Sequence, residues 1–216
     1  MALEDEYFGS PDKVALMRRS SELWRLLGDD PRYSWYGRAV ALGGPVADTA
    51  RALGALARLQ GAGVCYYFPK DEAEALFAEI AAAGFGTARH EHFRGGEEAH
   101  AAAWAVVEAH PLPGDLTLVR LDPSSPAELV AEVAALCTQC GVMPVPGAVM
   151  RGVTRRGITL AALDGSGAPV ATAASYALHH DDSPRARDVF WGALATRPDR
   201  RGSRLAMILG AMAILH

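Results

Sequence analysis

The residues best suited to chemistry lie near the end of the chain, in ALATRPDRRGSRLAMILG (193–210). The first N–H groups of a helix have no intrahelical acceptor, and the helix dipole favours an anion beside them. A glycine lets the backbone approach a ligand closely, and arginine side chains suit phosphate oxygens. The segment therefore predicts a phosphate site, with a pyrophosphate as the natural guest, at the start of a helix. Its candidate residues are Arg200, Arg201, Gly202, Ser203, Arg204, Leu205 and Ala206.

The arginines of this loop have a second interpretation, a solvated basic start of a helix. Arginines at a helix N-terminus oppose the dipole, so this interpretation needs a separate cause for their position. The phosphate interpretation needs none.

Two groups that precede the loop in sequence are candidates for proton transfer. Asp188 lies near the start of a predicted strand, and His179 ends the strand before it. A carboxylate or an imidazole can act as a general base. Each residue also has an ordinary interpretation, Asp188 as an acid at a strand end and His179 as part of a solvated turn.

The sequence offers no complete set of metal ligands. Cys137 and Cys140 form a single CxxC inside a predicted helix, and one such pair cannot complete a four-ligand zinc site. His90 and His92 alternate on a predicted strand, which suits an exposed strand face as well as a metal pair. We predict no metal.

The composition limits the possible partners. The net charge of −4 argues against a nucleic-acid partner, yet residues 151–216 carry 9 arginines and only 5 acids, which points to local anion binding. No apolar run approaches the roughly 20 residues that span a bilayer. The acidic start MALEDEYFGS does not resemble a signal peptide. We expect a cytoplasmic protein with no membrane partner.

The elements that must position these residues fall into two parts, with PLPG (111–114) as the preferred boundary. In the second part we expect a strand at 115–122, a helix at 124–141 with Ser125 as N-cap, and a hairpin of strands 157–164 and 168–180. A strand at 188–198 and a helix up to 216 follow, and this helix still looks apolar and uncapped where the sequence stops. The first part predicts helices at 13–27, 46–59, 71–85 and 97–110, and strands at 34–44, 63–69 and 86–95. The predicted domains are residues 1–112 and 113–216.

An internal repeat links the two parts. When the chain is shifted by 156 residues, ARALGALARLQ (50–60) lies over AMILGAMAILH (206–216), with six of eleven residues identical. Trp35 then lies over Trp191, and Ala39 over Ala195. Chance similarity of two Ala/Leu-rich helices is the alternative. The earlier copy has ALGGPVADT (41–49) where the later has RPDRRGSRL (197–205), so we expect only the later copy to hold a phosphate.

The segment Arg201-Gly202-Ser203-Arg204-Leu205-Ala206 resembles the acyl-CoA loop of the GNAT superfamily of N-acyltransferases, which reads Gln/Arg-x-x-Gly-x-Gly/Ala. Arg201 and Ala206 match this pattern, whereas Arg204 replaces its central glycine. The order of predicted elements in 115–216 is similar to the first two-thirds of a GNAT domain. Residues 34–95 resemble the back half of a degenerate GNAT unit, with Gly84-Phe85 where such chains often carry Gly-Phe.

The resemblance implies an α/β (mixed α+β) fold of the GNAT type, with a central mixed sheet flanked by helices. It implies acetyl-CoA or another acyl-CoA as cofactor, with the pantetheine beside Leu194, Ala195 and Thr196. We further expect the two parts to pack together as one continuous or closely abutting mixed sheet, in which strand 63–69 is buried. A pair of half-domains whose open edge is covered in a homodimer is the competing arrangement.

The resemblance favours an enzyme that transfers an acyl group from acyl-CoA to a primary amine of a small molecule or peptide. The missing glycine and the lack of an obvious base leave a second interpretation, an inactive acyl-CoA-binding or assembly module. A structural protein with a chance loop match is the third.

Overall fold

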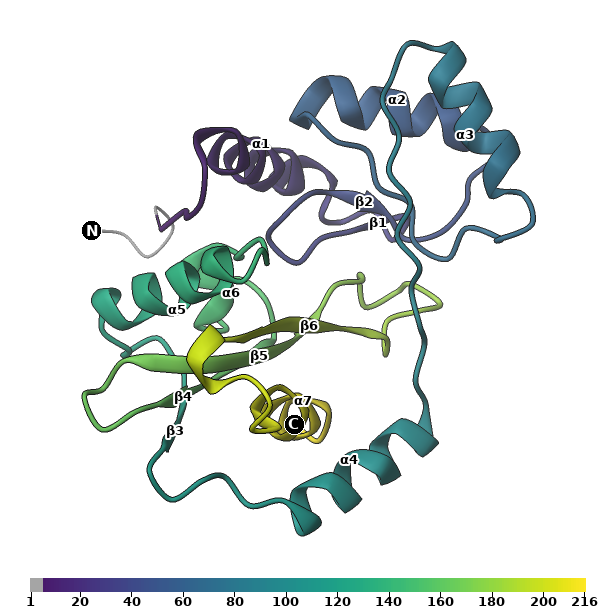
Figure 1. The fold of residues 1–216 in the computed structure, drawn as a ribbon. Helices are drawn as coiled ribbons and strands as arrows, with labels where there is room; N and C mark the ends of the chain where they lie inside the picture. Colours follow the sequence, from purple (N-terminus) through teal and green to yellow (C-terminus); the bar gives the residue numbers. More distant parts are fainter. Residues whose placement is uncertain (1–5) are drawn as a thin grey trace. The chain divides into compact units, whose positions relative to one another are not determined.

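The structure is a computed structural model that describes residues 6–216. The described chain is a mixed α+β protein with helices α1–α7 and an antiparallel four-stranded sheet in the order β3-β4-β5-β6 (Figure 1). It divides into two compact units. Unit 1 holds the described residues up to Val14 together with 95–177 and 189–216, and unit 2 holds 15–94 and 178–188.

Unit 1 contains the four-stranded sheet and the helices that cover it. The strands are β3 (Thr117–Arg120), β4 (Gly157–Leu163), β5 (Pro169–Ala177) and β6 (Val189–Thr196). The helices are α4 (Glu97–Ala109), α5 (Ala127–Gln139), α6 (Gly147–Met150) and α7 (Leu205–Ile214). The predicted hairpin around 165–167 is confirmed, since Leu160 of β4 pairs with Ala173 of β5 and the Gly167 N–H donates to the Asp164 carbonyl (2.8 Å).

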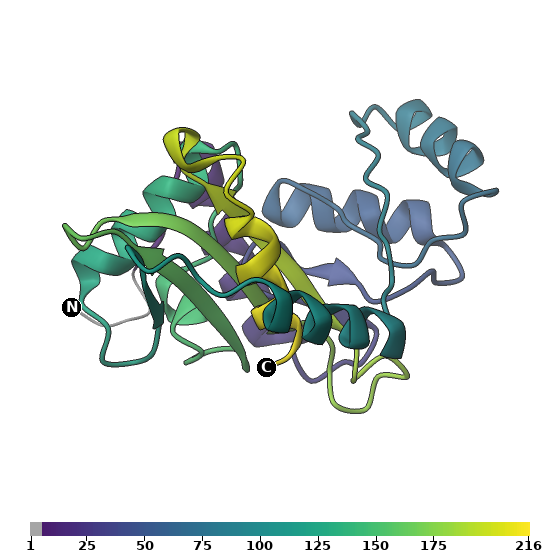
Figure 2. The ribbon, with the colours of Figure 1, turned by 60° about the horizontal axis from the view of Figure 1, so that its bottom comes forward.

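The two faces of this sheet are covered by different helices. α7 lies over one face of the sheet (Figure 2). There Ile158, Leu160 and Ala162 pack in a buried cluster with Leu205, Ile208 and Leu209 of α7. The alternation of β4 residues sends Ala161 to the other face, which α5 covers, and there Leu136 and Cys137 pack with Ala195. α7 is apolar nearly all round because α4 lies beside it on the side away from the sheet (Figure 2).

A glycine in the middle of α7 has a packing reason. A Cβ at Gly210 would lie 2.9 Å from the Trp191 ring, and the Trp191 Nε1–H donates to the Gly210 carbonyl (2.9 Å). Without the glycine, the helix and β6 would be forced apart.

Unit 2 combines three helices with one short sheet. It contains most of α1 (Pro11–Leu27), α2 (Thr49–Gln60), α3 (Ala73–Ala82) and a two-stranded antiparallel sheet of β1 (Tyr33–Ser34) and β2 (Ala41–Leu42). Gln60 is buried at the end of α2, where its amide bonds both the N–H (2.9 Å) and the carbonyl (2.7 Å) of Val40. That pairing fixes the chain between the two short strands.

Several sequence expectations need correction. The four-stranded sheet is antiparallel throughout rather than mixed, and residues 63–69 form no strand in it. Tyr67 has a left-handed backbone (φ 56°), which interrupts an extended run, and Cys65 forms only an isolated parallel bridge with Leu42. The segment is half-buried rather than buried. The idea of one continuous sheet is therefore wrong.

Three further boundaries differ from expectation. The predicted strand at 34–44 is two short strands, β1 and β2, and the predicted strand at 86–95 is irregular and almost wholly exposed. α5 begins at Ala127 with Pro126, not Ser125, as its N-cap. The Ser125 hydroxyl instead accepts a hydrogen bond from the Asp122 N–H (2.9 Å).

Candidate functional site

The loop predicted to bind phosphate joins β6 to α7. β6 carries a bulge, because Thr172 pairs with Ala195 and Ala174 with Gly192, which leaves Ala193 and Leu194 opposite the one residue between them. Ala193 takes a left-handed backbone (φ 52°) at this point. After Thr196 the chain makes a 3-10 turn, η2 (Pro198–Arg200), and then enters α7.

The start of α7 leaves its backbone donors open. Gly202 (φ 80°) and the N-cap Arg204 (φ 61°) both have left-handed backbones, and Arg204 makes no side-chain cap. The first hydrogen bond into the helix runs from the Ile208 N–H to the Arg204 carbonyl (3.0 Å). The N–H groups of residues 202–207 donate to no other described residue. Such a row of donors at a helix start, beside basic side chains, suits an anion.

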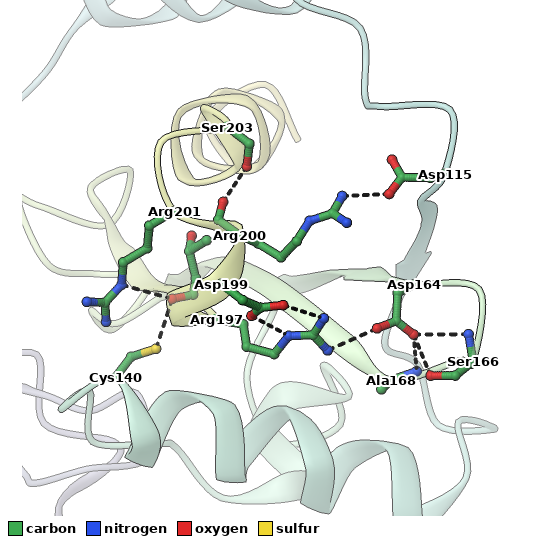
Figure 3. A network of polar contacts seen from close by, with 11 residues as sticks. Asp115, Cys140, Asp164, Ser166, Ala168, Arg197, Asp199, Arg200, Arg201 and Ser203 are labelled. Carbon is green, nitrogen blue, oxygen red and sulfur yellow. Dashed lines mark hydrogen bonds and ion pairs between the residues drawn. The ribbon is translucent and has the colours of Figure 1, made fainter.

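The arginines of the loop play different parts (Figure 3). Arg197, which lies outside the set of residues predicted to bind phosphate, bonds Asp199 (2.7 and 3.0 Å) and Asp164 (2.9 Å). Arg200 is paired with Asp115 (2.7 Å). Both side chains are therefore used to hold the loop.

Arg201 and Arg204 form no ion pair with any described residue. Arg201 Nε makes one long hydrogen bond to the Thr196 carbonyl (3.4 Å; Figure 3). Arg201 and Arg204 are both exposed. They are the two cations of the loop that remain available to an incoming anion. The Ser203 hydroxyl donates to the Arg200 carbonyl within the loop.

The end of β6 holds a polar group that is buried without a partner. The Thr196 hydroxyl oxygen meets no hydrogen-bond partner within residues 6–216, whereas the Thr196 carbonyl accepts from the Cys140 thiol (3.2 Å) and from Arg201. A buried hydroxyl normally finds a partner, so this one is a candidate ligand contact. Leu194 is half-buried and Ala195 is buried beside it.

The two copies of the repeat differ in whether a side chain caps the start of the helix. With the shift of 156 residues, α2 and α7 begin at equivalent positions, Thr49 and Leu205. The N-cap of α2 is Asp48, whose carboxylate accepts from the Arg51 N–H (3.0 Å), whereas the equivalent Arg204 caps nothing. A carboxylate of the chain itself thus caps the start of α2.

The two proton-transfer candidates meet in unit 2 through Tyr67, a residue that no motif in the sequence indicated. Tyr67 Oη donates to Asp188 Oδ2 (3.0 Å) and lies 3.4 Å from His179 Nε2. Arg94 donates to the other carboxylate oxygen of Asp188 (3.0 Å), and the Arg185 guanidinium lies 3.6 Å from the centre of the Tyr67 ring. We call these five side chains the Tyr67 cluster.

The Tyr67 cluster changes the properties of its members. Burial raises the pKa of Tyr67 to about 12, and the hydrogen bond to the Asp188 carboxylate adds to the effect. The His179 ring is buried and packs so closely on Gly43 that a Cβ there would lie 3.3 Å from Nδ1. In the sequence, the aromatic run that contains Tyr67 predicts only a strand and gives no sign of this site.

Residues 6–216 show neither a metal centre nor a membrane span. No group of three or more His, Cys, Asp or Glu side chains within these residues is arranged to hold a metal ion. None of the helices in this part of the chain has the length and apolar character needed to cross a membrane.

Comparisons with known proteins identify no family for this chain. No family model matches the chain, and no curated protein matches it. A crystal structure of a Drosophila protein is similar, with a TM-score of 0.47 and 12% identity over 94% of this chain and 75% of that one. Its description states no activity.

Proposed function

We propose that unit 1 binds acyl-CoA and that the protein transfers the acyl group to a primary amine. The observation that supports the proposal is the junction of β6 and α7. Six consecutive backbone N–H groups, at 202–207, meet no acceptor within the described chain and lie beside two unpaired arginines, Arg201 and Arg204. A pyrophosphate supplies the oxygens that these donors need.

The strand that leads into this loop suits the rest of the cofactor. Pantetheine is a linear chain of amides, and amide groups can hydrogen-bond a strand edge. β6 is an edge strand, so only one of its sides pairs within the four-stranded sheet. The strand has a bulge at Ala193–Leu194, close to its end at Thr196. The Thr196 hydroxyl, buried without a partner in residues 6–216, supports a contact with a ligand amide at this end.

The proposed reaction joins an amine to the acyl carbon. The neutral amine attacks the thioester carbonyl, a C–N bond forms, the C–S bond breaks, and the thiolate of CoA leaves and takes up a proton. The acceptor amine is charged at neutral pH, so a basic group must first take one of its protons. Asp188 and His179 are the proposed candidates, and together with the GNAT-type fold they remain part of this proposal.

One observation favours the second function, binding of acyl-CoA without transfer of the acyl group. Asp188 accepts hydrogen bonds at both carboxylate oxygens, so each oxygen already has a partner within the chain. A protein that binds acyl-CoA without transferring its acyl group would tolerate such an arrangement.

Two measurements test these functions in order. Calorimetry with acetyl-CoA and with CoA tests binding, and neither heat nor a thermal shift at millimolar ligand would exclude both functions. A thiol-release assay with acetyl-CoA and a panel of primary amines then separates them. An amine-dependent release of free thiol supports the transferase, whereas tight binding without release supports the binding module.

A further inference from the structure

The hydrogen bonds around Tyr67 have a definite direction. An ionised carboxylate only accepts, so the single hydroxyl proton of Tyr67 is donated to Asp188 Oδ2. The phenol oxygen is then the acceptor for His179 Nε2, and the proton between them belongs to the imidazole. The three side chains thus form one chain of donors, from His179 through Tyr67 to Asp188.

Of the two ends of this chain of hydrogen-bond donors, Asp188 is more exposed to solvent than His179. His179 is 3% exposed, whereas the side chain of Asp188 is 17% exposed. Arg94, which bonds Asp188 Oδ1, is 68% exposed, and an ion pair with so exposed a partner is weak. Asp188 Oδ1 is therefore the atom of the chain whose partner an amine from solvent replaces most readily.

The backbone and the ring of Tyr67 are held in place. Tyr67 has a left-handed backbone (φ 56°), which is strained for a residue other than glycine, and such strain gathers at functional sites. Backbone hydrogen bonds from Leu42 N to Val64 O (2.8 Å) and from Tyr66 N to Leu42 O (3.0 Å) hold the preceding residues. The Arg185 guanidinium covers one face of the ring.

Tyr67 remains a donor at neutral pH. Because burial and the neighbouring carboxylate raise the pKa of its hydroxyl to about 12, the proton stays on the phenol. Tyr67 is thus suited to orient a carboxylate and unsuited to accept a proton itself.

We infer that Tyr67, backed by the buried imidazole of His179, is a positioning residue that orients Asp188 as the proton acceptor for the amine. The inference rests on the proposed function. Asp188 Oδ1 takes a proton from the ammonium group of the acceptor and later returns it to solvent. The neutral amine then attacks the thioester, and the thiolate takes the second proton from the new amide nitrogen. His179 is a positioning residue in this arrangement.

The test compares Tyr67→Phe with Tyr66→Phe. Both changes remove one phenol oxygen from the same segment, but the Tyr66 hydroxyl bonds Tyr36, and only its ring lies near His179, at 6.5 Å between ring centres. In the thiol-release assay we expect Tyr67→Phe to lower kcat about tenfold to a hundredfold, as misplacement of a reacting group does. The Kd for acetyl-CoA should stay within about twofold, and Tyr66→Phe should keep kcat within about threefold. Asp188→Asn should lower kcat by about a hundredfold or more.

A second readout does not depend on turnover. Nitrogen NMR of histidine-labelled protein reports which ring nitrogen of His179 carries the proton. We expect the Nε2–H form in the wild type and in Tyr66→Phe, and a changed ring signal in Tyr67→Phe. An unchanged kcat or an unchanged His179 signal in Tyr67→Phe overturns the inference. A wild-type protein that binds acetyl-CoA but releases no thiol overturns the proposed transfer and the role of Asp188. The NMR signal still decides whether Tyr67 orients the cluster.

Discussion

Arg204 has a backbone conformation that glycine adopts without strain. Its φ of 61° falls at the position where the resembling acyl-CoA loop has its central glycine. Arg204→Gly removes a left-handed penalty of about 1 kcal/mol, so we expect it to stabilise the protein by up to that amount in urea unfolding. We expect CoA binding to be kept or tightened as well.

Gly202→Ala is the matched control for this prediction. Gly202 has φ 80°, and the space that a methyl group would occupy there is open, so the substitution adds only backbone strain. It should destabilise the protein by about 1 kcal/mol. A clear loss of CoA affinity in Arg204→Gly would show that the guanidinium itself contacts the ligand.

Arg201 carries the second residue-scale prediction. Its side chain forms no ion pair with the described residues, so it is available to a phosphate. Arg201→Ala should weaken CoA binding by about 1–3 kcal/mol, the range for a hydrogen bond to a charged group. Isothermal titration with CoA measures the effect, and Arg120→Ala on exposed β3 is the control that should change little. Equal affinities in wild type and Arg201→Ala would remove Arg201 from the site.

At the scale of elements, Asp164 joins the β4–β5 turn to the loop after β6. Its carboxylate accepts from the Ser166 hydroxyl (2.6 Å) and N–H (3.0 Å) and from Arg197 (2.9 Å). The Ser166 hydroxyl first, and Arg197 second, lower the pKa of Asp164 to about 2. Because the folded pKa is below the unfolded value of about 3.9, the stabilisation is present above pH ~4 and is lost as the pH falls towards 2.

The variant Asp164→Asn tests this link. At pH 6 it should unfold at a lower urea concentration than the wild type, and the difference should shrink as the pH falls from about 4 to 2. A difference between the two proteins that stays constant over this range would show that the Asp164 charge contributes nothing to stability.

Another element-scale contact ties the first described residues to α6. Glu6 and Arg151 form a buried ion pair (2.8 and 3.1 Å), with side chains 6% and 1% exposed, and Arg151 also donates to the Ser125 carbonyl. Glu6→Ala leaves a buried guanidinium without its counter-charge, so we expect a loss of about 3–5 kcal/mol in unfolding free energy. The exposed pair of Glu22 and Arg25 is the control, and Glu22→Ala should cost less than about 1 kcal/mol. A cost below about 1 kcal/mol for Glu6→Ala would mean that water reaches Arg151.

The sequence predicted those elements whose local pattern and tertiary role agree. Helices α1–α5 and α7 and the β4–β5 hairpin follow from periodicity and from the turn at 165–167. The loop after β6 is located by its arginines. That Arg197 and Arg200 hold the loop depends on Asp164 and Asp115, which lie 33 and 85 residues away and give no local signal.

The wrong predictions also concern residues whose contacts lie far away in the sequence. GVCYYFP (63–69) has a strand composition, but Tyr67 has a left-handed backbone and its hydroxyl contacts residues 179 and 188. Propensity is a weak guide where tertiary contacts decide the backbone. The Tyr67 cluster joins segments 112 and 121 residues apart, so no spacing in the sequence could indicate it.

On the scale of the whole molecule, neither unit is a continuous piece of sequence. Unit 1 needs α4, which packs on α7, and the segment with Glu6. We therefore expect residues 113–216 produced alone to lack cooperative unfolding, because Arg151 would lose its counter-charge and α7 an apolar neighbour. Near-ultraviolet circular dichroism during urea unfolding measures this. A single sharp transition in the fragment would contradict the expectation. The predicted domain boundary between residues 112 and 113 stays a prediction.

The same connectivity has a mechanical consequence. Glu6 and His216 both belong to unit 1, and the chain enters and leaves unit 2 between them. Tension applied between these two residues is borne by unit 1 alone while unit 1 is folded. Unit 2 lies off the load path until unit 1 has yielded. Single-molecule pulling from these two points should therefore show two ruptures in a fixed order. The first should release only residues 6–14 and 189–216, because folded unit 2 still bridges the ends of residues 95–177 until the second rupture.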